Sequence, residues 1–149
     1  MIAKELSVWQ TVDTFFGAPQ LSRTKVEQLF DVTLSRLESS NHYFTFWESA
    51  GDMLKDGVRV SRILLRTSNT DKNTPDVITL HLSEKCMTLD DVTSRYGNVS
   101  MTDAPRDRSN DEETSYEASG TWGKLVFGFA QRDPNCLSSV GFAPPSRIR

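Results

Sequence analysis

The side chains best suited to chemistry in this chain are two cysteines and two histidines. They lie at His42, His81, Cys86 and Cys136. No pair of them has the Cys-x-x-Cys or His-x-x-x-His spacing typical of a zinc site. Cys136 would need a histidine and an Asp nearby in space to act as a nucleophile, and its flanking residues lack the small-residue turn that exposes a thiol at a helix N-terminus. We therefore expect a non-enzymatic protein without metal or cofactor, and a Cys/His hydrolase is only the third hypothesis.

The two cysteines have two further interpretations. They are either buried thiols of a protein from a reducing compartment, or one disulfide between Cys86 and Cys136. The disulfide would close a loop of about 50 residues and contribute roughly 3–4 kcal/mol in the chain-entropy model. The choice between them depends on the compartment, and both remain open at this point.

Length and charge exclude several classes of protein. The chain has 149 residues, of which 37% are hydrophobic and 25% charged, as in one ordinary globular domain. Its net charge is −3, so the chain lacks the global positive field of a dedicated nucleic-acid binder. This argues against a nucleic acid as partner. We find neither an apolar run long enough for a transmembrane helix nor the pattern of a signal peptide.

The hydrophobic pattern predicts three helices. Apolar residues three and four apart indicate an amphipathic helix over residues 6–16, which ends at Gly17. A second helix is expected over residues 24–37, where Thr24 and Glu27 would form a capping box. A third, shorter helix opens at Thr88 with Asp91 as its capping partner and ends at Gly97.

Alternating patterns predict an antiparallel sheet of about five strands. The five segments are residues 42–47, 58–66, 77–82, 122–129 and 136–142. Residues 100–115 are almost free of apolar side chains, so we expect a solvated, mobile loop there, and the prolines after residue 143 predict a flexible tail over 143–149. The fold class is therefore α+β, with two or three helices packed on one face of the sheet. We expect a single domain over residues 1–149.

A short internal repeat suggests that this domain has two halves. Residues 12–17 and 92–97 share the pattern of a Val, three residues, an aromatic residue and a Gly. Each copy would be the end of a helix that is followed by antiparallel strands. One interpretation is a tandem arrangement with halves over residues 1–85 and 86–142. The alternative is that both segments carry the same signal for the end of a helix, which explains so short a match equally well.

The second copy resembles a known family. Residues 87–97 followed by 122–127 are similar to the helix-then-strand unit of the small outer-membrane assembly lipoproteins, and a tandem of such units resembles the β-lactamase inhibitory protein fold. The matching positions are Met87, Thr88, Val92, Gly97 and Trp122, with Phe16, Gly17 and Pro19 in the first copy. The chain departs from the pattern in having no lipidation cysteine at its start, a long second helix and a longer loop after Gly97. The resemblance implies a non-enzymatic, extracytoplasmic module that binds another protein across its sheet face.

Aromatic and arginine side chains provide the candidate binding surface. Tyr43, Trp47 and Trp122 are the aromatic residues that we expect to remain exposed as anchors for a partner. Arg59 and Arg62 would join them only if a bulge brought both to one face, because side chains alternate along a regular strand. The alternative is that these arginines are edge charges that prevent sheets from associating.

These observations favour a protein-binding module, namely a bacterial periplasmic or secreted protein of the inhibitor or assembly type. The alternative is a cytoplasmic immunity or adaptor protein. We expect a monomer rather than an obligate oligomer, with another protein as its partner.

Overall fold

The computed structural model describes residues 2–16, 21–71, 74–106 and 108–145. It is an α+β fold built on one antiparallel sheet, with three α-helices and one short 3-10 helix among the described residues. The helices are η1 (Ala3–Glu5), α1 (Val8–Phe16), α2 (Arg23–Phe30) and α3 (Leu89–Tyr96). The strands are β1 (Ser35–Arg36), β2 (Phe44–Ser49), β3 (Arg59–Ser68), β4 (Val77–Ser83), β5 (Ser100–Asp103), β6 (Glu113–Gly120), β7 (Gly123–Ala130) and β8 (Leu137–Ala143).

The sheet has eight strands in the order β1-β2-β3-β4-β8-β7-β6-β5. Each half of the sheet therefore follows the order of the chain, and the two halves meet where β4 pairs with β8. The topology is compatible with the tandem halves suggested by the repeat, but the repeat itself stays a prediction.

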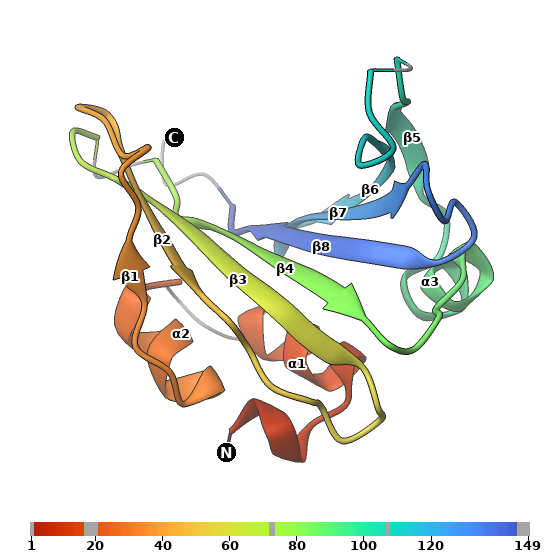
Figure 1. Ribbon diagram of the computed structural model, residues 1–149, viewed down its shortest axis with the longest axis horizontal. Coiled ribbons are helices and arrows are strands. Elements are labelled where there is room, and N and C mark those ends of the chain that lie inside the picture. Colours follow the sequence, from red (N-terminus) through yellow and green to blue (C-terminus); the bar gives the residue numbers. More distant parts are fainter. Residues whose placement is uncertain (1, 17–20, 72–73, 107, 146–149) are drawn as a thin grey trace.

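All three α-helices pack on the same side of the sheet (Figure 1). The Phe15 ring of α1 lies 5.7 Å from that of Phe142 in β8, and the Tyr96 ring of α3 lies 5.4 Å from that of Phe127 in β7. Val26 of α2 is buried in the same core. We call this side of the sheet the helix face and the opposite side, which carries no helix in Figure 1, the open face.

The strand alternation that builds the core is clearest in β4 and β7. Ile78, Leu80 and Leu82 are buried, while the residues between them are half-buried on the open face. In β7, Leu125 and Phe127 are likewise buried and lie opposite residues of β8 that belong to the same core. Because period-two alternation puts every second side chain on one face, both strands were predictable from the sequence.

The helix predicted over residues 24–37 is shorter than expected. It ends at Asp31, which has the left-handed φ of 53°, and Ser22 caps its start instead of Thr24 by accepting the Lys25 N–H. The Glu27 carboxylate does not complete a capping box, because it accepts the Leu34 N–H at 2.7 Å. The chain is thereby turned out of the helix toward β1. The predicted end of the first helix at Gly17 and the tail residues 146–149 lie outside the described residues.

The connection predicted over residues 100–115 is shorter than expected, and the sheet has eight strands instead of about five. The five expected strands are present, and the three additional ones are β1, β5 over residues 100–103 and β6 over residues 113–120. The link between β5 and β6 is organised around Glu112, whose carboxylate accepts the N–H groups of Arg106 and Arg108 at 2.6 and 2.9 Å. These hydrogen bonds lower the pKa of Glu112, with the Arg106 N–H as the main cause. Polar composition alone does not reveal a turn held by one carboxylate.

Candidate functional site on the open face

A bulge in β3 brings three arginines to the open face. The register with β4 shifts between Val60 and Arg62, so Ser61 is the extra residue. Arg59, Arg62 and Arg66 then lie opposite residues of β4 that alternate away from its buried side chains. The idea that these arginines are edge charges was wrong, because β3 lies between β2 and β4 inside the sheet.

Only two of these three arginines have a carboxylate partner among the described residues. Arg59 Nε lies 2.9 Å from Glu84 Oε1, and Arg62 Nε lies 2.6 Å from Glu48 Oε1. Arg66 instead lies over the Phe44 ring, with its guanidinium carbon 4.5 Å from the ring centroid. Its Nε is buried and has no hydrogen-bond partner. Arg66 is therefore the open-face arginine that has no carboxylate partner among the described residues.

Two phenylalanines complete an aromatic–arginine patch, which we define as Phe44, Phe46 and Arg66. The two rings come from β2, with centroids 6.5 Å apart, and Phe46 lies opposite Arg66 in the sheet register. Both rings are only half-buried, and neither packs against the hydrophobic core. Tyr43, which is 62% exposed, immediately precedes them. The patch thus places large apolar surface and an arginine together on the uncovered face.

The structure does not bring together the three aromatic anchors proposed from the sequence. Trp47 lies on the helix face, where its indole N–H donates to Thr67 Oγ1 at 3.0 Å and Arg23 of α2 lies over its ring. Trp122 packs on Phe16, with ring centroids 4.5 Å apart. Of the three, Tyr43 is strongly exposed, and their role in binding stays a prediction.

Sequence reasoning missed Phe44 and Phe46 because both faces of this strand carry large rings. If the strand is assumed to be shifted by one residue, the side chains assigned to the helix face and those assigned to the open face exchange places. The facing is revealed by Arg23 of α2, which covers Trp47 rather than Phe46. That contact depends on where the helix packs, which periodicity does not specify.

A row of polar side chains crosses the open face beside the patch. Arg62 in β3 lies opposite His81 in β4, and His81 lies opposite Ser139 in β8. Ser139 Oγ donates to Glu113 Oε2 at 2.8 Å, and Ser138 Oγ donates to the same oxygen at 2.6 Å. The Glu113 carboxylate lies where a side chain on Gly128 would be, so this glycine in β7 makes room for it. The row therefore extends from β3 to β6 across the middle of the sheet, and hydrogen bonds join its members in β8 and β6.

Glu113 is expected to stabilise the β6–β7–β8 part of the sheet. Its replacement by Ala leaves the buried Ser139 without its acceptor, so we expect Glu113→Ala to lower the free energy of unfolding by about 1–3 kcal/mol. Glu117→Ala is the matched control, because this neighbouring carboxylate makes only a surface ion pair with Lys124, which is worth about 0–1 kcal/mol. Urea unfolding measures both. A Glu113→Ala variant no less stable than the control contradicts the assignment.

His81 makes the stability of the sheet depend on pH. Burial lowers its pKa, and the charge of Arg62 lowers it further, whereas Glu113 and Glu48 act in the opposite direction. Below the ordinary histidine pKa of about 6.5, the unfolded chain therefore takes up the proton more readily than the folded one, and stability falls as the pH falls. We expect His81→Gln to lose less stability than the wild type between about pH 7 and 5. The exposed His42 provides the control variant His42→Gln, and equal pH slopes for wild type and His81→Gln contradict the prediction.

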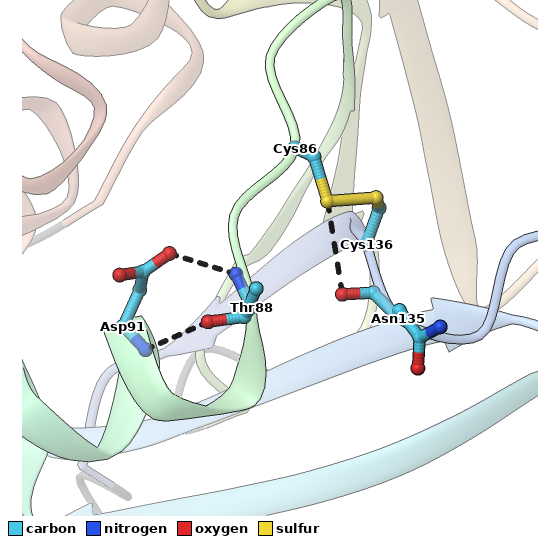
Figure 2. Close-up of a disulfide and its surroundings, with 5 residues drawn as sticks. All are labelled: Cys86, Thr88, Asp91, Asn135 and Cys136. Carbon is cyan, nitrogen blue, oxygen red and sulfur yellow. Dashed lines mark hydrogen bonds between the residues drawn. A yellow bond between two sulfur atoms is a disulfide. The ribbon is translucent and has the colours of Figure 1, made fainter.

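Cys86 and Cys136 form a disulfide, which connects the segment before α3 to the start of β8 (Figure 2). The Leu137 N–H donates to Met87 O at 2.7 Å beside it, and Thr88 and Asp91 form the capping box predicted for α3. Of the two interpretations of the cysteines, the structure shows the disulfide. In this bond neither sulfur is a thiol nucleophile, so the structure offers no support for a Cys/His hydrolase.

The described residues contain no group of three or more His, Cys, Asp or Glu side chains that could hold a metal ion. Within the same residues, no helix is long and apolar enough to cross a membrane. Comparisons with protein-family models, curated proteins and solved structures gave no match to this chain. The resemblance to the outer-membrane assembly lipoproteins and the β-lactamase inhibitory protein fold stays a hypothesis. The functional argument therefore depends on the open face itself.

Proposed function

We propose that this protein is a non-enzymatic protein-binding module, a bacterial periplasmic or secreted protein of the inhibitor or assembly type, whose partner binds on the open face. The observation that carries the proposal is the aromatic–arginine patch, because its two phenylalanine rings are half-buried on a face without a helix and do not contribute to the core. Aromatic and arginine side chains are enriched among the residues that dominate protein–protein binding energies.

The disulfide supports the extracytoplasmic part of the proposal. Structural disulfides persist in oxidising compartments and are rare in the cytosol, so the pairing of Cys86 with Cys136 favours a periplasmic or secreted protein over a cytoplasmic adaptor. The neighbouring polar row also suits a binding role, since Arg62 with its partner Glu48, together with His81, would supply a hydrogen-bonding rim beside the apolar patch.

Site-specific photo-crosslinking in the cells of origin tests the proposal. A benzophenone amino acid at Phe46 should give a discrete adduct with one protein, whereas the same group at Gln28, which is exposed on α2, should not. The captured protein is then purified and its affinity measured. We expect Phe46→Ala to weaken binding about 30-fold, the effect of a contact worth about 2 kcal/mol, and Gln28→Ala to leave binding unchanged. Equal crosslinking at both positions, or an unchanged affinity for Phe46→Ala, overturns the proposal.

A further inference from the structure

We propose that the partner segment received by the open face is acidic: an exposed peptide stretch that places an Asp or Glu carboxylate on the Arg66 guanidinium and an adjacent apolar side chain on Phe44 and Phe46. This inference rests on the proposed function and specifies the chemistry of its partner. It follows from the charges and apolar contacts around one arginine.

Charge complementarity indicates the carboxylate. Arg59 and Arg62 already pair with Glu84 and Glu48, but Arg66 has no ion pair among the described residues and its buried Nε–H has no acceptor. A partly buried cation without a counter-charge is unfavourable, so an incoming carboxylate gains more here than at the two paired arginines. The planar guanidinium suits a carboxylate because two parallel N–H groups can donate to its two oxygens.

The surroundings of Arg66 indicate an apolar neighbour for that carboxylate. The guanidinium lies on the Phe44 ring, and the residues opposite Arg66 in the two adjacent strands are Phe46 and Val77. The side chains of Phe44, Phe46 and Val77 are all half-buried on the open face. A peptide that covers them displaces water, which lowers the local dielectric constant and strengthens the new ion pair.

The same observations favour a peptide over a nucleic acid. Aromatic and arginine side chains also stack on bases, but nucleic-acid binding requires several cations along the phosphate backbone. The patch offers one arginine without a partner, on a chain of net charge −3. A single acidic side chain matches one free guanidinium.

The test is a selection of random twelve-residue peptides displayed on phage against the purified, oxidised full chain. The bound peptides should be enriched in Asp or Glu next to an aromatic or aliphatic residue. Synthetic versions should bind Arg66→Gln about tenfold more weakly than the wild type, and Arg66→Lys should recover part of the loss. Arg36→Gln is the matched control, because this exposed arginine of β1 lies opposite Trp47 and so belongs to the helix face. Thermal unfolding of every variant establishes that it is folded.

The outcomes separate this inference from the proposed function. Peptides that lose affinity with Phe46→Ala but carry no acidic residue, or bind Arg66→Gln as well as the wild type, overturn the inference and leave the open face as a protein-binding surface. A selection in which no peptide depends on Phe46 overturns both. Single-stranded oligothymidylate is added as a competitor, and its binding at the patch with a tenfold loss in Arg66→Gln would overturn the inference in favour of a nucleic acid.

Discussion

Replacing Cys86 and Cys136 together by serine is expected to lower the free energy of unfolding by about 4 kcal/mol, the chain-entropy estimate for a loop of this size. The disulfide spans a sequence separation of 50 residues, and without it the unfolded chain gains the freedom of that whole loop. Urea unfolding of the wild type and the double serine variant, both without reductant, measures the difference.

Reductant provides the internal control for this prediction. Dithiothreitol should lower the unfolding midpoint of the wild type toward that of the double variant and should not change the double variant itself. A wild type whose thiols are shown to be free after reduction, but whose midpoint has not moved, contradicts a stabilising role for the bond.

The second large effect is expected for the replacement of Phe127 in β7. The adjacent Val126 faces the opposite side of the sheet and provides the comparison. Phe127 is fully buried in the core and contacts Tyr96 of α3, so Phe127→Ala should cost about 3–5 kcal/mol through lost burial and the cavity that it leaves. Val126→Ala removes two methyl groups from the half-buried open face, where neighbours and water can adjust, and should cost less than about 1 kcal/mol.

The ratio of these two effects tests which face of the sheet is covered. Comparable losses for Phe127→Ala and Val126→Ala would mean that another element covers the open face, which would contradict both the fold described here and the availability of the patch. Chemical unfolding and the near-ultraviolet circular dichroism of the aromatic residues measure stability and core packing independently.

The parts of this fold that sequence reasoning predicted are those in which local signals act alone. The capping box of Thr88 and Asp91 determines where α3 begins, and the alternation through Ile78 and Leu80 determines which side of β4 is buried. Neither depends on a partner element. The sequence did not decide whether the two cysteines form a disulfide, because pairing depends on their distance in space and on the redox compartment.

The parts that were missed depend on tertiary contacts. The strand β6 has no strong apolar alternation, and it is defined by pairing with β7 and by Glu113, which reaches across Gly128 to β8. The facing of Trp47 is determined by Arg23 of α2 and the hydrogen bond to Thr67. The candidate site changed accordingly, from the aromatic anchors Tyr43, Trp47 and Trp122 to a patch built on the two phenylalanines that lie between Tyr43 and Trp47 in the sequence.

The pairing of β4 with β8 has a consequence for the growing chain. During synthesis β4 emerges well before β8, the last described strand, because the segments of α3, β5, β6 and β7 come between them. Until β8 is made, β4 is an edge strand with a full row of unpaired backbone groups and an apolar face, which is the kind of surface that nucleates aggregation. A ribosome-stalled or truncated chain that lacks residues after Cys136 should therefore be an efficient client of chaperones, although most of the sheet's strands are already present.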